Sequence, residues 1–344
     1  MKTLSLFGNM EIGFIWGKYN MEEHFNNIIC EATGASSFRE IEVIQSLWNG
    51  YGKIVRLGLV GSVHKTVVVK HVQYKKVEEH PRGWDTDLSH ERKLKSYEVE
   101  SEWYLKWSSQ CDENCKVPKC FAVETFENEV IIVLEDLNGT DYCETRTNAT
   151  RIEIEACLTW LADFHATFMH NVPLKLWQQG TYWHLSTRPD ELESLDDLQL
   201  KEVASLIDRK LANCKYKTIV HGDAKLANFC FTKEGSKAAA VDFQYVGGGC
   251  GMKDVAYFLG SCMSESECEE YVPFYLDVYF KKLKEALDSS KVSVNEIETE
   301  LRELFPYAWV DFYRFLKGWS PSHWKINSYS EKVTRNVVES IQNS

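Results

Sequence analysis

The stretch IVHGDAKLANFCF, residues 219–231, followed by AAAVDFQYV, residues 238–246, carries the densest chemical signal in this chain. Each apolar run leads into polar side chains: Asp223 and Asn228 follow the first, and Asp242 follows the second. Phosphoryl transfer from a nucleotide needs one carboxylate near the attacking hydroxyl and two oxygen ligands for the metal on the phosphates. Because Mg²⁺ is a hard ion, Asn and Asp oxygens suit it and Cys or His would not. The pattern therefore predicts phosphoryl-transfer chemistry.

The spacing of these residues indicates which class of phosphotransferase they resemble. Asp223 and Asn228 match the catalytic-loop pattern H-R-D-x-x-x-x-N, and Asp242 stands where a D-F-G aspartate would. Gly222 replaces the Arg of the first pattern, and Gln244 replaces the Gly of the second. These two departures favour kinases of small molecules over protein kinases.

The ordered motifs HGD-x4-N and DFQ resemble those of the aminoglycoside phosphotransferase and choline kinase superfamily, and most closely its ecdysteroid-kinase-like branch. The resemblance extends over residues 38–325, with close matches only at the motifs. It implies an α+β, bilobal protein-kinase-like fold: an N-terminal antiparallel sheet lobe plus one helix, then a mainly helical C-terminal lobe. The alternative is an ordinary strand–turn–strand whose polar side chains are satisfied locally.

Length and charge are consistent with such an enzyme. A chain of 344 residues suits two lobes better than one simple core, and 44% hydrophobic residues support a packed globular protein. The 39 basic and 51 acidic side chains give a net charge of −12. That balance argues against a general nucleic-acid binder, which normally carries a basic patch. It is compatible with a cationic substrate, although we expect most of the charge on solvated surface.

The eleven cysteines run from Cys30 to Cys268 without a disulfide pattern. The closest group, Cys111, Cys115 and Cys120, lacks the C-x2-C pairs typical of structural zinc. We therefore expect free thiols in a reducing cytosol and a cytoplasmic protein.

The N-terminal segment does not have the pattern of a signal peptide. Glu11 interrupts its apolar character, and no small-residue cleavage site follows. Residues 1–20 are compatible with a short extra element, and Met21 with an alternative start. No run of about 18 apolar residues occurs, so we expect no membrane span. The sequence gives no indication of the oligomeric state.

The N-terminal half alternates strand-like and helix-like segments. Residues 21–33 and 94–110 have helical spacing, whereas residues 73–93 are charged, contain Pro81 and Gly83, and are predicted to be an irregular excursion. Segments rich in β-branched or alternating apolar residues predict strands at 40–48, 53–60, 65–72, 119–126 and 129–137. The first three are expected to form an antiparallel meander.

A change in character after Leu137 predicts a lobe boundary. The polar, turn-prone stretch there leads into a long predicted helix at 154–171. We assign residues 1–137 to a nucleotide-binding lobe and residues 138–344 to a catalytic and substrate lobe.

Asp223 is the predicted catalytic base, which accepts or orients the proton of a substrate hydroxyl. Asn228 and Asp242 are predicted to hold Mg²⁺ on the nucleotide phosphates, because a divalent ion neutralises a carboxylate that is costly to bury unpaired. Structural alternatives are a turn cap for Asp223 and a loop-bonding amide for Asn228, the latter compatible with metal binding. By resemblance, His221 braces the loop and takes no part in the chemical step.

Lys70 ends TVVVK, a near match to the V-A-I-K strand signature, and is predicted to bind the α- and β-phosphates. It needs an acidic partner, and Glu98, Glu100 and Glu102 all lie on the following helix. The family pattern of an acidic residue three before an aromatic pair selects Glu100, with Trp103 and Tyr104 as its packing neighbours. A solvated acidic helix face is the alternative.

The sequence patterns for two further nucleotide-binding segments are weaker. Gly50 and Gly52 supply only a G-x-G for the phosphate-covering loop, which leaves its contacts open. By resemblance, the strand ending near Glu135 to Leu137 is the hinge whose backbone groups bond the purine edge. An ordinary buried strand end is the alternative there.

Three other features have predicted structural roles. Asp254 resembles the family carboxylate that ties down the loop or caps a helix. The glycines at 247–249 predict flexibility or unusual backbone angles. His165 lies on an amphipathic helix and is expected to be a satisfied packing residue rather than a substrate contact.

The acceptor pocket is expected in the C-terminal lobe, where residues 177–185 and 305–324 are rich in Trp and Tyr. Aromatic faces hold quaternary ammonium groups by cation–π attraction or stack on flat apolar alcohols. Most of these rings are expected in the core, and Asp311 is a candidate counter-charge. The stretches carry no dense acidic run of the kind that an aminoglycoside needs, so we predict a choline-like or lipophilic alcohol.

The leading functional hypothesis is an ATP- and Mg²⁺-dependent small-molecule kinase that phosphorylates an alcohol group. The alternative is a catalytically silent, kinase-like nucleotide-binding or regulatory protein. Retention of Lys70, Asp223, Asn228 and Asp242 argues against that alternative. A protein kinase is disfavoured by DFQ and by the absence of an A-P-E element.

Overall fold

The computed structural model describes residues 23–47, 50–74, 87–126, 128–287 and 293–343. The chain forms two compact units: a first unit of Met1–Arg82 and Lys119–Gly139, and a second unit of Gly83–Pro118 and Thr140–Ser344. The predicted extra element at residues 1–20 lies outside the described residues. The division into lobes at residues 1–137 and 138–344 stays a prediction; the chain contacts place residues 83–118 with the second unit.

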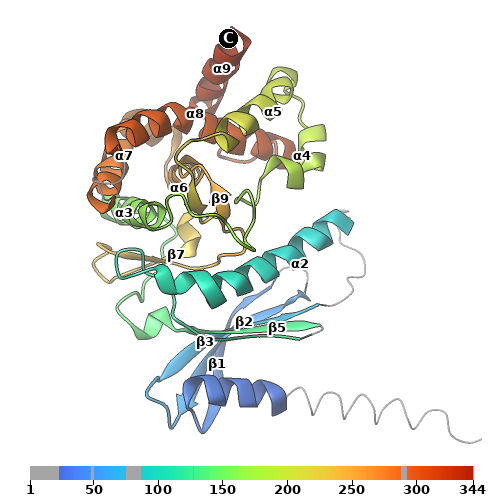
Figure 1. The fold of residues 1–344 in the computed structure, drawn as a ribbon, viewed down its shortest axis with the longest axis vertical. Helices are drawn as coiled ribbons and strands as arrows, with labels where there is room; N and C mark the ends of the chain where they lie inside the picture. Colours follow the sequence, from blue (N-terminus) through green and yellow to red (C-terminus); the bar gives the residue numbers. More distant parts are fainter. Residues whose placement is uncertain (1–22, 48–49, 75–86, 127, 288–292, 344) are drawn as a thin grey trace, which may run out of the picture. The chain divides into compact units, whose positions relative to one another are not determined.

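The first unit is built on a five-stranded antiparallel sheet (Figure 1). Its strands are β1 (Ser37–Ser46), β2 (Gly52–Val60), β3 (Thr66–Gln73), β4 (Cys120–Thr125) and β5 (Glu129–Glu135). Their order is β1-β2-β3-β5-β4, so the predicted meander is extended by a hairpin whose second strand pairs with β3. The five predicted strands are all present, with ends that differ by a few residues.

The core of this unit lies between the sheet and a helical segment at residues 23–33. Ile28 and Ile29 of that segment pack on Val55, Val69 and Ile131 of the sheet. Alternate residues of a strand face opposite sides, so these strand residues form one apolar face. The helical spacing predicted for residues 21–33 is confirmed over the described part.

Strand β1 is an edge of the sheet, and nearly all of its side chains are exposed. Its register with β2 shifts twice, between Glu40 and Glu42 and again between Val43 and Gln45. Such irregularities bend a strand and interrupt its row of hydrogen bonds.

Helix α2 (Asp87–Glu102) belongs to the second unit and continues into a π-helical turn at Trp103–Trp107 and a 3₁₀ turn at Ser108–Gln110. The prediction of an irregular excursion over residues 73–93 is wrong for residues 87–93, which are helical. No Pro or Gly occurs after Gly83 in that stretch, so nothing in it breaks a helix.

Hydrogen bonds to distant parts of the chain also stabilise the first turns of α2. The Arg92 guanidinium donates to the Thr187 carbonyl at 2.7 Å, and the Lys93 ammonium donates to Gln244 Oε1 at 2.6 Å. These bonds join α2 to segments about a hundred residues or more later in the chain, which local sequence patterns do not reveal.

The rest of the second unit is mainly helical. Its helices are α3 (Arg151–Thr167), α4 (Pro189–Glu193), α5 (Leu198–Ala212), α6 (Met252–Cys262), α7 (Glu265–Ala286), α8 (Val294–Trp319) and α9 (Ser328–Gln342). Helix α8 packs against α5, α6 and α9, and α3 packs against α7. An antiparallel sheet in one unit and helices in the other confirm the predicted α+β fold of the bilobal protein-kinase-like type. None of the helices among the described residues is long and apolar enough to cross a membrane.

Capping boxes begin two of these helices. The Thr150 hydroxyl and the Glu153 carboxylate exchange hydrogen bonds with each other's backbone N–H at the start of α3, and Ser264 and Glu267 do the same for α7. The helix predicted at residues 154–171 begins three residues earlier, at Arg151, because Thr150 satisfies its first turn, and it ends four residues earlier, at Thr167.

An aromatic cluster fills the core of the second unit beside α3. Trp160 stacks on Phe164 with ring centroids 4.8 Å apart, and Trp103 stacks on Phe243 at 4.5 Å. Phe243 directly follows Asp242, so this packing holds the second motif next to the end of α2.

Helix α8 also carries a fully buried carboxylate, Asp311. It lies 3.2 Å from the Lys253 ammonium and 2.9 Å from the Arg314 guanidinium, and it accepts a bond from Trp183 Nε1 at 3.0 Å. Burial raises the pKa of Asp311, but the two cations outweigh it and lower the pKa to about 2. The expectation that Asp311 offers charge to a substrate is therefore wrong, because its charge is used inside the core.

We predict that Asp311→Ala lowers the free energy of unfolding by about 3–5 kcal/mol, because it leaves two buried cations without their carboxylate. Urea unfolding followed by circular dichroism measures this change.

Asp277→Ala is the matched control. Asp277 pairs with Arg302 at 2.6 Å, but its side chain is 70% exposed, so its removal should cost less than about 1 kcal/mol. Equal losses of stability in the two variants would show that the buried ion pairs of Asp311 contribute no more to stability than an exposed ion pair.

Candidate active site

The candidate active site is built on four three-residue strands of the second unit. They form two antiparallel pairs, β6 (Thr218–Val220) with β9 (Gly247–Gly249) and β7 (Phe229–Phe231) with β8 (Ala238–Ala240). Asp223 and Asn228 lie in the loop from β6 to β7, and Asp242 lies two residues after β8. The two motifs therefore start from buried strands, as predicted.

Two glycines allow the strands to approach closely. Gly222 has φ +81°, and a Cβ there would lie 2.1 Å from the Tyr245 carbonyl oxygen. A Cβ on Gly247 would lie 2.2 Å from the Trp177 carbonyl oxygen. The unusual backbone angles predicted for residues 247–249 are not found, because these glycines form strand β9 without a positive φ, and Gly247 is needed for space. The flexibility predicted as the alternative stays a prediction.

The backbone of the loop that carries Asp223 is hydrogen-bonded to a buried carboxylate. Asp254 of α6 accepts the backbone N–H groups of His221 at 2.6 Å and Gly222 at 2.9 Å. His165 Nε2 lies 3.2 Å from the same carboxylate, and its Nδ1 lies 2.8 Å from the Tyr279 hydroxyl. The structural roles predicted for Asp254 and His165 agree with these contacts.

His221 links the two motifs. Its Nδ1 accepts the backbone N–H of Asp223 at 3.2 Å, and its Nε2 lies 3.0 Å from the carbonyl oxygen of Val241. The ring is fully buried. These contacts agree with a bracing role, because both ring nitrogens are engaged by backbone groups.

Asp223 is buried and is contacted by three polar side chains. Its Oδ2 accepts from the Lys225 ammonium at 3.0 Å and from Asn228 Nδ2 at 3.1 Å, and its Oδ1 accepts from the Tyr257 hydroxyl at 3.1 Å. Burial raises the pKa of Asp223, Lys225 opposes the rise, and the nearby Asp242 adds to it. The carboxylate is thus both oriented and made a better proton acceptor than an exposed aspartate.

The Asn228 side chain is oriented by two bonds from its amide nitrogen. Besides the bond to Oδ2, Nδ2 donates to the backbone oxygen of Asp223 at 2.8 Å. Among the residues that the structure describes, Oδ1 of Asn228 accepts no hydrogen bond. The side chain therefore bonds the loop through its nitrogen and keeps its oxygen for another ligand.

Asp242 has φ +67°, a strained backbone conformation for a residue with a side chain. Its Oδ1 accepts from Gln244 Nε2 at 2.8 Å, and the oxygen of the same amide accepts from Lys93 at 2.6 Å. The glutamine that distinguishes this motif thus connects Asp242 to helix α2. Strain of this kind is concentrated at functional sites.

The donor set fits a hard divalent cation. The free Oδ1 of Asn228 and the partly exposed Asp242 carboxylate are oxygen donors near a second carboxylate, Asp223. Within the described ranges, no group of three or more His, Cys, Asp or Glu side chains is arranged to hold a metal ion. Mg²⁺ commonly takes only one or two protein oxygens together with substrate phosphates and water.

Lys70 and Glu100 are both buried, in different units. Lys70 lies in β3 between Ile54 and Ile132 of the neighbouring strands, and Glu100 lies in α2. Glu98 is exposed and pairs with Lys95 at 3.2 Å. Burial therefore favours Glu100 over Glu98, while the pairing with Lys70 stays a prediction.

The predicted hinge residues end β5 and begin a 3₁₀ turn at Leu137–Gly139. The Glu135 N–H donates to the Lys119 carbonyl at 2.8 Å, and Leu137 is buried. Asp136, between them, binds Arg56 at 2.8 Å. Their contact with a purine stays a prediction.

Only part of the predicted phosphate-covering loop is described, because Trp48 and Asn49 lie outside the described residues. Gly50 and Gly52 have φ +75° and +129°, and a Cβ on Gly52 would lie 2.0 Å from the His71 carbonyl oxygen. These glycines are therefore required by the turn before β2, whatever the loop binds.

Three residues of the site were missed at the sequence level: Lys93, Lys225 and Tyr257. Lys225 was visible as the only cation inside the first motif, two residues after Asp223. Tyr257 lies three residues after Asp254 on the same helix, which places both on one face. Lys93 had no local signal, because it comes from a distant helix.

A comparison with protein families matches residues 178–292 to the ecdysteroid kinase-like family. The matched segment contains Asp223, Asn228, Asp242 and Asp254. It confirms the resemblance that the motifs predicted, to the ecdysteroid-kinase-like branch of the small-molecule kinases. A comparison with curated protein sequences found no match.

Solved structures with a similar course of the chain include three small-molecule kinases. A microcompartment-associated aminopropanol kinase is 12% identical over 87% of this chain and 88% of its own, with a TM-score of 0.47. The choline kinase LicA from Streptococcus pneumoniae is 14% identical over 94% and 100%, with a TM-score of 0.43. An ethanolamine kinase from Plasmodium vivax is 13% identical over 88% and 82%, with a TM-score of 0.48.

We predict that Asp254→Asn lowers the free energy of unfolding by about 1.5–3 kcal/mol, because one oxygen that accepts a backbone N–H is replaced by an amide nitrogen. Chemical unfolding of the purified variant measures the loss. Asp277→Asn, at an exposed helix position, is the control and should change stability little. A variant as stable as the parent would exclude the proposed brace.

Proposed function

We propose that this protein is an ATP- and Mg²⁺-dependent phosphotransferase that moves the γ-phosphoryl group of ATP to the hydroxyl of a small molecule. The observation that carries the proposal is the convergence of Asn228 and Asp242 on the buried carboxylate of Asp223. A buried carboxylate with two adjacent oxygen donors is the minimal protein contribution to phosphoryl transfer. The family match over the same segment supports it.

In the proposed reaction, the substrate hydroxyl oxygen bonds to the γ-phosphorus while the bond from that phosphorus to the β–γ bridging oxygen breaks. ADP leaves, and the hydroxyl proton passes to Asp223. The raised pKa of this carboxylate suits it to receive a proton late in the transfer. Tyr257 and Lys225 fix its two oxygens, so the carboxylate is oriented before the substrate arrives.

The metal would be held by Asn228, whose Oδ1 accepts no hydrogen bond from the described residues, and by Asp242, whose backbone is strained. Mg²⁺ in such a site neutralises charge on the nucleotide phosphates. We assign the nucleotide-binding contacts to Lys70, Glu100, Glu135 and Leu137, as the motifs predict. In the nucleotide-binding role, Glu100 holds Lys70 extended rather than contacting the nucleotide.

The acceptor is a small molecule with an alcohol group. The sequence favours a choline-like or lipophilic alcohol because of the aromatic residues at 177–185 and 305–324. Most of these rings are core residues: Trp183, Phe312 and Phe315 are buried, whereas Trp319 and Trp324 are exposed. The exposed and cavity-lining aromatics therefore remain as candidates for acceptor contacts.

The proposal is tested by a screen that incubates the protein with Mg²⁺, ATP and pools of small alcohols. ADP release and a product heavier by one phosphate support it. The alternative, a kinase-like protein that binds nucleotide without turnover, predicts nucleotide binding with no ADP release for any pool.

We predict that Asp223→Asn keeps the fold and nucleotide binding but lowers phosphoryl transfer about 10²–10⁴-fold, because the amide cannot accept the hydroxyl proton. Steady-state ADP release and a nucleotide titration measure the two properties separately. Asp141→Asn, at an exposed position, serves as the control. Turnover within a few-fold of the parent would remove Asp223 from the role of base.

We predict that Asp242→Ala abolishes Mg²⁺-dependent turnover, whereas Asn228→Ala raises the Mg²⁺ concentration needed for half-maximal activity. A carboxylate supplies a full negative charge to the ion and an amide oxygen only a dipole, so the first loss is the larger. Activity measured against Mg²⁺ concentration distinguishes the variants. Unchanged Mg²⁺ dependence in both would contradict the metal assignment.

A further inference from the structure

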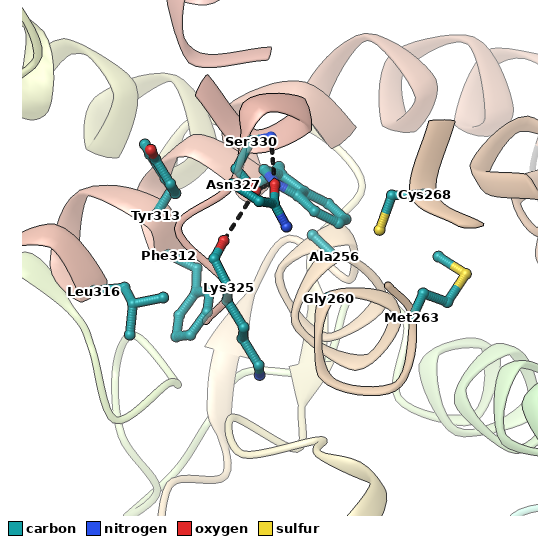
Figure 2. A pocket seen from close by; sticks show the side chains of 11 residues that line it. Ala256, Gly260, Met263, Cys268, Phe312, Tyr313, Leu316, Lys325, Asn327 and Ser330 are labelled. Atoms are coloured by element: carbon teal, nitrogen blue, oxygen red, sulfur yellow. Dashed lines mark hydrogen bonds between the residues drawn. The ribbon is translucent and has the colours of Figure 1, made fainter. Parts of the chain in front are cut away.

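A lysine in the segment between α8 and α9 has an unusual environment. Lys325 lines a small pocket together with Ala256, Phe312 and Leu316. In Figure 2 its side chain extends past Phe312, and its ammonium points away from Ser330. The backbone oxygen of Lys325 accepts the Ser330 hydroxyl at 3.3 Å, which anchors this end of the residue.

Three aromatic rings surround the ammonium. Lys325 Nζ lies 5.0 Å from the ring centroid of Tyr257, 5.4 Å from that of Phe312 and 5.6 Å from that of Trp324. The faces of aromatic rings attract cations at such distances. Three rings around one cation are the arrangement with which proteins recognise a quaternary ammonium group. Here the chain's own lysine occupies that place.

In the part of the chain that the structure describes, no carboxylate lies within ion-pair distance of this ammonium. Among the residues that the structure describes, the Lys325 side chain forms neither a hydrogen bond nor an ion pair. Other partly or fully buried lysines of the unit are paired: Lys253 with Asp311 at 3.2 Å and Lys317 with Asp197 at 2.9 Å. Burial lowers the pKa of Lys325 to about 8. An ammonium withdrawn from water without an anion is costly unless a ligand supplies one.

The position of the ammonium relates it to the candidate active site. Tyr257, whose ring lies beneath the Lys325 ammonium, donates its hydroxyl to Asp223 Oδ1 at 3.1 Å. The same tyrosine therefore contacts the cation through its ring face and the proposed catalytic base through its hydroxyl. The charges of Asp223 and Lys225 both act on Lys325, which is consistent with this proximity.

We propose that Lys325 binds an anionic group of the acceptor, so that the substrate is a hydroxylated molecule carrying a carboxylate, phosphate or sulfate. The inference rests on the proposed phosphotransferase function and deepens it. The acceptor's hydroxyl lies at Asp223 and its anionic group at Lys325, and Tyr257 contacts both of these residues. A choline-like acceptor is disfavoured, because its quaternary ammonium group would have to bind the same aromatic faces as the Lys325 ammonium, and the two positive charges repel each other.

The nearby acidic groups do not offer an alternative cation site. Asp311 is enclosed by Lys253 and Arg314, and Asp223 is engaged by Lys225. Besides the three aromatic rings, the groups whose charges act on the Lys325 ammonium are the Cys262 thiol, the Asp223 carboxylate and the Lys225 ammonium, and burial raises the pKa of the Cys262 thiol, which keeps it neutral. This balance favours an anion on the acceptor over a cation.

The test uses three acceptors of one shape that differ in charge. They are 4-(hydroxymethyl)benzoate, 4-methylbenzyl alcohol and 4-(hydroxymethyl)phenyltrimethylammonium. Each carries its hydroxyl and its variable group at opposite ends of one ring. Isothermal titration measures the binding of each to the protein without nucleotide, so the result does not depend on turnover.

We expect the benzoate to bind more tightly than the neutral alcohol, and the trimethylammonium compound to bind least. Lys325→Met should weaken benzoate binding about 10–100-fold, the usual loss when a charged hydrogen bond is removed, and leave the neutral alcohol unchanged. Lys325→Arg should retain most of the preference. Lys332→Met, at a lysine of α9 that is 69% exposed and pairs with Glu269, is the matched control.

Equal binding of the three compounds by the parent protein, or benzoate binding unchanged in Lys325→Met, would overturn the inference. The comparison of the three compounds needs only the parent protein, so it stands even if Lys325→Met does not fold. A second readout is ADP release with the same three compounds and ATP. Charge preference in binding without ADP release from any acceptor would support the anion site and count against the proposed phosphotransferase function.

Discussion

The carboxylate of Asp254 fixes the backbone from which the whole site extends. It accepts the N–H groups of two consecutive residues, His221 and Gly222, where the chain leaves strand β6. The left-handed turn at Gly222 follows directly, and Asp223 is the next side chain. His165, on helix α3, contacts Oδ2 of the carboxylate, the oxygen that also accepts the His221 N–H. Because all these groups are buried, losing one contact would leave a polar group unpaired away from water, which is costly.

The buried charges of the second unit fall into two groups: those neutralised by neighbouring ions and those neutralised only in part. Asp311 is surrounded by cations deep in helix α8, which stabilises the fold but leaves it unable to act on a ligand. Asp223 and Lys325 are compensated incompletely: the pKa of the first is raised, and that of the second is lowered, each mainly by burial. Incomplete compensation costs stability, and such groups are typical of functional sites because a substrate or metal supplies the missing charge.

The parts of this molecule that local patterns encode were predictable. Runs of β-branched residues predicted the five strands, and the motif spacing predicted that Asp223, Asn228 and Asp242 would converge, because each follows a short buried strand. The geometry of residues 247–249 was not predictable, since glycine letters show freedom of backbone angle but not the neighbouring carbonyl that leaves no room for a side chain. Asp311 and Lys325 were misjudged or missed for a related reason. Their environments are created by residues far away in the chain, such as Lys253 and Tyr257.

The irregular pairing of strand β1 has a consequence for the protein in a crowded solution. An edge strand with exposed Ile41, Val43 and Ile44 offers a surface onto which another chain's strand could add, the first step of aggregation. The two register shifts divide β1 into short regular stretches, so an incoming strand finds only a few backbone groups in line at a time. The irregular hydrogen bonding of β1 thus makes it a poor template for another chain's strand and disfavours pairing between molecules at this edge.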